Sequence, residues 1–152
     1  MQHLSLQAAA TLTEWSERTL RRRIADGSLR CAADNEAHYK TMICFDSIKQ
    51  DICIALEAGD IELIKAADSG GAKAQNDLAL LFLQQNKPKS AVYWLELAAK
   101  QQVSDAMHLL GGCYLEGSGV LKDDNLAMMW IAKAASLGHL IAIAQIQWMR
   151  RI

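Results

Sequence analysis

The sequence predicts a mainly α-helical protein of two modules, a helix-turn-helix domain with a small two-stranded wing at residues 1–57 and a short α-solenoid of helix pairs at residues 58–152. Two patterns predict this division. The second half repeats itself at a fixed interval, and the first third combines short helical segments with strand-like ones. The composition agrees with helices, because alanine, leucine and isoleucine dominate and the single proline is Pro88.

The second half contains copies of one pattern offset by 36 residues. Ala91 corresponds to Ala127, and Trp94 corresponds to Trp130. An earlier copy, with a loop four residues shorter, is visible at Ala74, which corresponds to Ala106 and Ala142. A period of this size is typical of stacked helix pairs. The expected helices cover residues 60–69, 73–84, 88–101, 104–115, 124–136 and 140–150. Both tryptophans recur on the packing side, so both are expected in the core.

The repeated stretch carries a recognisable motif. AMHLLGGCYLEGSGV at 106–120, followed by DDNLAMMWIAKAASLGHLIA at 123–142, resembles the Sel-1-like repeat, a relative of the tetratricopeptide repeat. The preceding copy is degenerate, with Leu78-Ala79 in place of Leu-Gly and Phe82 in place of the tyrosine. The resemblance implies a curved α-solenoid that serves as a protein-binding scaffold and not as an enzyme.

A helical wheel places one set of side chains opposite the packing face of the first helix of each pair. The expected partner-binding groove is lined by Asn76, Leu80, Leu83, His108, Leu115 and Trp148. Leu80, Gly112 and Trp148 fall in one row, which could form an anchor pocket for a partner. The alternative is that Trp148 only covers the open end of a short solenoid. His108 and His139 lack ligand-spaced partners, so packed or exposed histidines are expected there and a metal site is not.

The first third predicts a winged-helix outline. SLQAAATL forms one helix with Leu4 on its apolar side, and Ser16 caps a second helix that stops at Gly27. Two short strands are expected around DNE at 34–36, and Asp46 is expected to cap a helix over SIKQDICIALEAG. In that last helix, one apolar face is expected to consist of Ile48, Ile52 and Leu56.

The same segment resembles the MerR/excisionase-type winged helix-turn-helix family. The matching elements are Leu-x-x-Ala-Ala from Leu6, Ser-x-x-Thr-Leu-x-Arg from Ser16, and Ile-x-x-Gly-x-Leu from Ile24. In that family the second helix enters the major groove of DNA, the wing runs over the backbone, and the proteins usually dimerise. Carried over, the DNA contacts would be Ser16, Arg18, Thr19, Arg21 and Arg22, with Arg30 or Lys40 from the wing.

Arginine chemistry fits this expectation, because guanidinium groups bind phosphate oxygens and guanine edges in a forked geometry. However, residues 1–44 hold six basic and five acidic residues, so their net charge is only about +1. The alternative is that Arg18 to Arg23 form a solvated helix face on a domain used for protein contacts.

The sequence therefore predicts a small bacterial regulator that binds double-stranded DNA through its winged helix and a protein partner through its repeats, with a homodimer implied by the resemblance. The alternative is a pure protein–protein adaptor without DNA binding. An enzyme is not expected, since no nucleophile with a base, phosphate loop or metal cluster is found, and no cofactor is expected. The four cysteines form no C-x-x-C pair and are expected as free thiols. No signal peptide or membrane span is found, so a cytoplasmic location is expected.

Overall fold

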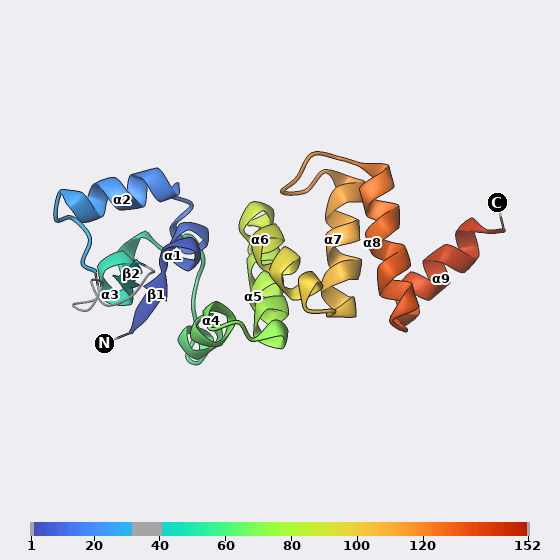
Figure 1. Cartoon of the computed structure of the whole chain (residues 1–152), viewed down its shortest axis with the longest axis horizontal. Helices are drawn as coiled ribbons and strands as arrows, with labels where there is room; N and C mark the ends of the chain where they lie inside the picture. Colours follow the sequence, from blue (N-terminus) through green and yellow to red (C-terminus); the bar gives the residue numbers. More distant parts are fainter. Residues whose placement is uncertain (1, 32–40, 152) are drawn as a thin grey trace. The chain divides into compact units, whose positions relative to one another are not determined.

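The computed structural model describes residues 2–31 and 41–151 and divides into two compact units, Met1–Asp68 and Ser69–Ile152. Helices dominate both units (Figure 1). The sequence places the boundary after residue 57, whereas helix α4 (Asp60–Asp68) groups with the first unit. One reason is that the amide and the hydroxyl of Ser5 both donate to the carboxylate of Asp68, the last residue of α4. No helix formed by the described residues is long and apolar enough to span a lipid bilayer.

The first unit combines a two-stranded antiparallel sheet with short helices. Strand β1 (His3–Ser5) pairs with β2 (Met42–Cys44), and Leu4 lies opposite Ile43. Helix α1 (Leu6–Thr13) begins at Ser5, whose Oγ accepts the amide of Ala8 at 3.1 Å. Helix α2 (Glu17–Ala25) begins in the same way at Ser16. The core of this unit includes Leu4, Leu6, Ala9, Leu12, Leu20, Leu29, Ile43 and Ile48, all buried.

Two expectations for this unit are wrong. Leu4 does not begin a helix, because it lies in β1 and pairs across the sheet. The helix expected over residues 47–59 is reduced to α3 (Phe45–Ile48) and a 3-10 turn, η1 (Lys49–Asp51). Its N-cap is Cys44 rather than Asp46.

A tertiary hydrogen bond explains why that helix stops. The backbone at Ile52 is extended, and the amide of Cys53 donates to the carbonyl oxygen of Leu12 at 2.7 Å. This amide can therefore not serve a helix of its own segment. As a result Ile48 is buried while Ile52 and Leu56 are only half-buried, so the expected apolar face does not form. The segment around DNE and Lys40 lies outside the described residues.

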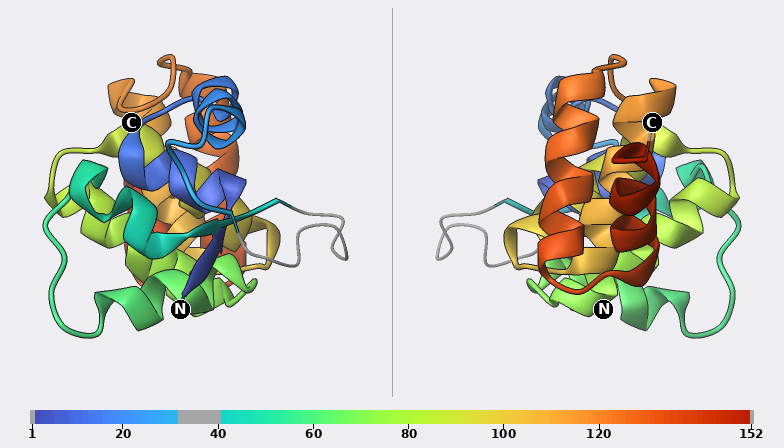
Figure 2. Two further views of the ribbon diagram at one scale, coloured as in Figure 1. Left: turned by 90° about the vertical axis from the view of Figure 1, so that its left-hand side faces the viewer. Right: turned by 90° about the vertical axis from the view of Figure 1, so that its right-hand side faces the viewer.

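The second unit is a stack of antiparallel helices. In chain order it contains α5 (Ala72–Gln84), α6 (Pro88–Lys100), α7 (Ser104–Glu116), α8 (Asp124–Ser136) and α9 (Leu140–Met149). α5 pairs with α6, α7 pairs with α8, and α9 packs on α8. Seen from the end of this unit, α8 and α9 lie side by side in the foreground (Figure 2, right). The six helices expected from the repeat, these five and α4 of the first unit, are confirmed to within two residues at each end.

Small residues set the spacing of these helices. Ala91, Ala98, Ala106, Ala127, Ala134 and Ala142 are all fully buried. At Gly111 a Cβ atom would lie 2.8 Å from Cγ1 of Ile131 and 3.2 Å from the carbonyl oxygen of Ala127, so α7 approaches α8 as closely as a glycine permits. The alanine period predicted from the sequence is therefore the line along which the helices touch.

The two repeated tryptophans differ, contrary to expectation. Trp94 is 1% exposed and belongs to the core. Trp130, which was expected in the core as well, is only half-buried. The ammonium group of Lys133 lies over its ring, 4.9 Å from the centroid.

The loop between α7 and α8 reaches back to the preceding helix pair. Gly119 in this loop has a φ of 74°, and a Cβ atom there would lie 2.5 Å from the carbonyl oxygen of Pro88. The loop ends at Asp123, whose Oδ1 accepts the amide of Leu126 at 3.0 Å and caps α8. Glycine is thus required at 119 by both its backbone angle and its neighbour.

Candidate protein-interaction surface

Leu80 on α5, Gly112 on α7 and Trp148 on α9 are the residues that we call the inner row. These three residues occupy equivalent positions of successive repeats. Leu80 is half-buried, and a Cβ atom at Gly112 would meet nothing within 4 Å. Trp148 is 64% exposed. The inner row therefore offers an aliphatic side chain, a gap and an uncovered indole.

Other residues expected in the groove lie at different depths. Leu83 and Leu115 are half-buried, as side chains at the edge of a binding surface would be. Asn76 is 6% exposed, so its side chain lies largely beneath the surface. A helical wheel gives the direction of a side chain but not how far its neighbours cover it.

His108 joins two helices instead of facing solvent alone. Its Nε2 lies 3.1 Å from Oε1 of Gln145, which connects α7 to α9. Its ring stacks on that of His139 with a centroid distance of 4.5 Å. Burial lowers the pKa of His108, and the neighbouring charge of His139 lowers it further. The neutral imidazole is therefore the favoured form.

His139 has its own structural tasks. Its Nδ1 accepts the amide of Ala142 at 3.2 Å and caps α9, while its Nε2 lies 3.0 Å from Oδ1 of Asp105. The pairing of His108 with His139 was missed from the sequence. The sequence contained a signal for this pairing. His108 lies on α7, and His139 directly precedes α9, the helix equivalent to α7 in the next repeat. Within the described ranges, no three His, Cys, Asp or Glu side chains gather as metal ligands.

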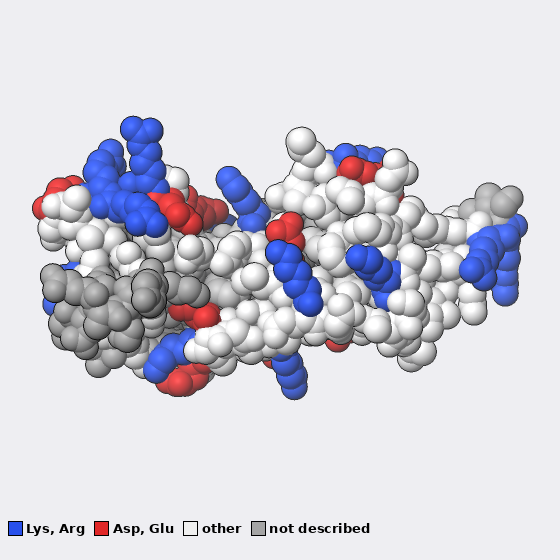
Figure 3. Space-filling view, viewed as in Figure 1, with Lys and Arg blue, Asp and Glu red and all other residues white. Residues whose placement is uncertain are grey.

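The arginines expected to contact DNA lie on α2 and just after it. Blue side chains gather over α2, with red ones beside them (Figure 3). Arg18, Arg21, Arg22 and Arg30 are exposed, while Thr19 is half-buried. The hydroxyl of Ser16 accepts the amide of Thr19 at 3.1 Å and is thus engaged in capping α2. Lys40 lies outside the described residues.

Local partners reduce the basic character of α2. Arg23 is half-buried, with its guanidinium carbon 4.0 Å from the centroid of the Trp15 ring. Arg21 lies 3.9 Å from the carboxylate of Glu17, one turn earlier. Hydrogen bonds from Ser28 lower the pKa of Asp26 at the end of the helix, with smaller contributions from Arg22 and Arg23, so this acid stays charged beside the cluster.

The repeats of a known family are found in the second unit. The Sel1 repeat family matches at residues 72–103 and 104–139. A Sel1 repeat protein from Oxalobacter formigenes is 36% identical over 55% of this chain and 67% of its own length, with a TM-score of 0.50. A protective antigen of uropathogenic Escherichia coli strains, which displays an SLR fold, is 32% identical over 59% of this chain with a TM-score of 0.55. This chain spans 20% of the length of that antigen. No curated protein matches the chain.

These matches bear on the two resemblances differently. The family match begins at residue 72, and no comparison supports a winged helix-turn-helix in the first unit. The repeats behave as the sequence predicts, with stacked helix pairs in register with the matched segments. Through residues 72–139, this chain belongs to the Sel1-repeat family.

Proposed function

We propose that this protein is an adaptor that binds a protein partner through the inner row of its Sel1 repeats, without catalysing a reaction. The observation that carries the proposal is Trp148, a large indole that is 64% exposed. Aromatic side chains of this kind are common anchors in protein interfaces, because they bury a large apolar area at low entropic cost. The gap at Gly112 next to it in the row would receive an apolar side chain of the partner.

Replacing Trp148 with alanine is expected to remove partner binding and leave the fold intact, since the indole contributes little to the core. The matched control is Leu121→Ala, which removes an apolar side chain that is 90% exposed in the α7–α8 loop. Affinity capture with the purified full chain, quantified by mass spectrometry, should show partners depleted about tenfold or more by Trp148→Ala, as for an interface hot spot. The control should retain them.

The capping alternative gives a different result. If Trp148 only covers the end of the solenoid, Trp148→Ala would capture the same proteins as the unaltered chain. It would instead lower the melting temperature, which circular dichroism measures. That pair of results would refute the adaptor proposal at this surface.

DNA binding is a second candidate function, favoured by one observation. Arg18, Arg21 and Arg22 are exposed on the helix that the MerR/excisionase resemblance would place in the major groove. The double variant Arg21→Ala/Arg22→Ala should weaken binding of a labelled duplex and reduce the salt slope of log K by about 2 between roughly 50 and 200 mM salt. The control Arg150→Ala/Arg151→Ala removes equal charge from exposed positions elsewhere. Equal affinities for all three proteins in fluorescence anisotropy would exclude this role for α2.

A further inference from the structure

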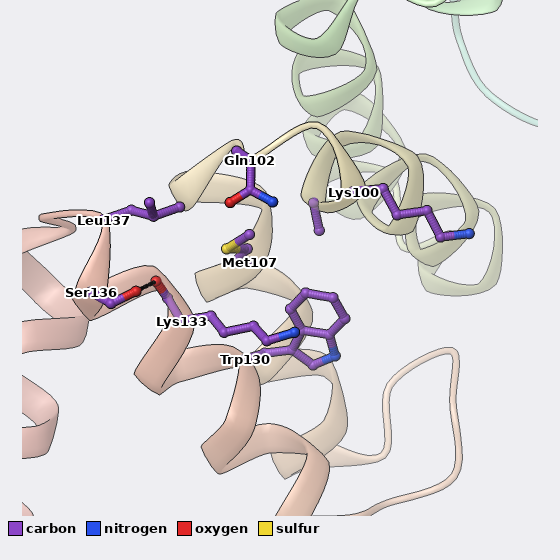
Figure 4. Close-up of a pocket in the computed structure, with 8 residues that line it drawn as sticks. Lys100, Gln102, Met107, Trp130, Lys133, Ser136 and Leu137 are labelled. Carbon is purple, nitrogen blue, oxygen red and sulfur yellow. Dashed lines mark hydrogen bonds between the residues drawn. The ribbon is translucent and has the colours of Figure 1, made fainter.

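A pocket of about 280 Å³ opens between the C-terminal ends of α6 and α8 (Figure 4). Met107 on α7 and Trp130 on α8 form apolar parts of its lining. Leu137, which is 47% exposed, adds an aliphatic wall just after α8. The volume is at the lower end of the roughly 300–1,000 Å³ range of small-molecule sites and leaves room for one side chain of a larger partner.

The charged groups at this pocket have one sign. Lys100 and Lys133 line it, and no Asp or Glu does so in the described part of the chain. The Lys133 side chain reaches the Trp130 ring, whereas that of Lys100 extends away from it (Figure 4). Neither ammonium group has a carboxylate partner within 4.0 Å among residues 2–31 and 41–151. Lys133 is held over the Trp130 ring at 4.9 Å, so its charge stands directly beside the apolar lining.

In the preceding repeat, formed by α5 and α6, two glutamines close the position that is equivalent to this pocket. There Gln75 and Gln101 stand at the positions of Met107 and Leu137. Nε2 of Gln101 donates to Oε1 of Gln75 and to the carbonyl oxygen of Gly70, each at 2.9 Å. These hydrogen bonds tie the end of α6 to the start of α5. Methionine and leucine cannot form them, so this polar seal is missing in the second repeat.

Two further differences separate the repeats. Leu97 stands where the second repeat has Lys133, so Lys133 has no cationic counterpart in the preceding repeat. Trp94 is 1% exposed, whereas its equivalent Trp130 is half-buried and accessible. The second repeat thus combines a lost seal, an uncovered indole and an added ammonium group at one place.

We infer that this pocket binds an acidic peptide segment of a protein partner, with one aromatic or aliphatic side chain on Trp130 and a flanking carboxylate on Lys133. The inference goes beyond the proposed function, because the pocket lies on other helices than Trp148 and constitutes a second surface. The charge of the lining selects the acidic partner, and the indole selects the apolar side chain.

The test uses the full chain and the blocked peptide Asp-Glu-Phe-Glu-Asp. Nuclear magnetic resonance reports on each of the four indole groups separately, so the shifted signal identifies the site. The Trp130 signal should move on titration, and that of Trp148 should not. Peptides with alanine in place of phenylalanine, or with lysines in place of the acids, should bind about tenfold more weakly or not at all.

Variants make the assignment specific. Lys133→Glu should weaken binding about tenfold, whereas Lys73→Glu, an equal charge change at an exposed site on α5, should not. Met107→Gln/Leu137→Gln introduces the glutamines of the preceding repeat and should close the pocket. A thermal melt of that variant checks that it folds, and Lys133→Glu carries the test if it does not.

Two outcomes would overturn the inference. If peptide binding changes neither with Lys133→Glu nor with loss of the phenyl group, the peptide is held only by unspecific charge attraction and not by this pocket. A shift of Trp148 in place of Trp130 would move the peptide to the inner row, which would refute this pocket while supporting the proposed function.

Discussion

Replacing Trp94 with alanine is expected to lower the free energy of unfolding by about 3–5 kcal/mol, the range for removing a fully buried aromatic side chain. Trp94 is 1% exposed, and its ring meets that of Tyr93 edge-on with a centroid distance of 5.0 Å. Its loss would leave a large void beside α6. The closely packed core cannot move far enough to fill that void.

The matched variant is Trp130→Ala. It removes the same side chain at the equivalent position of the next repeat, where the ring is half-buried. Urea denaturation followed by circular dichroism should give a loss of only about 1–2 kcal/mol, in proportion to the smaller buried area. Equal losses for both variants would contradict the difference in burial.

Gly111→Leu is expected to destabilise the second unit by at least about 2 kcal/mol. A Cβ atom at this position would lie 2.8 Å from Cγ1 of Ile131 and 3.2 Å from the carbonyl oxygen of Ala127. Ile131 is itself buried, and the carbonyl belongs to the backbone of α8, so neither can move freely. α7 and α8 would have to separate.

The adjacent glycine provides the control for this variant. Gly112→Ala meets nothing within 4 Å, and alanine is preferred to glycine inside a helix, so it should stabilise the chain by about 0.5–1 kcal/mol. Chemical denaturation of both variants measures the two effects. A gain in stability for Gly111→Leu, or a clear loss for Gly112→Ala, would show that the close approach of α7 and α8 is described incorrectly.

The repeat could be predicted from the sequence because its alanines serve one physical purpose throughout. Positions such as Ala98, Ala134 and Ala142 recur where helices touch, and the helices between them begin and end within two residues of their predicted bounds. The repeat period in the sequence does not indicate how far neighbouring residues bury a tryptophan ring. Trp94 and Trp130 are therefore identical in the pattern and different in burial.

The first unit could be predicted less well because its contacts are not periodic. β1 is only three residues long and pairs with β2, far away in the sequence. The amide of Cys53 leaves its helix for the carbonyl oxygen of Leu12, a contact that no local preference reveals. Among the candidate site residues, the exposure of Trp148 agrees with the helical wheel, whereas the burial of Asn76 depends on neighbours that a wheel omits.

The contact of Gly119 with Pro88 bears on cooperativity. Each helix pair of a solenoid ordinarily adjoins the next through one interface, so that pairs can unfold one after another from an end. Here the loop between α7 and α8 also rests on the first turn of α6, with no room for a Cβ atom at Gly119. The second pair is therefore fastened to the first at two places, and opening either pair exposes surface of both.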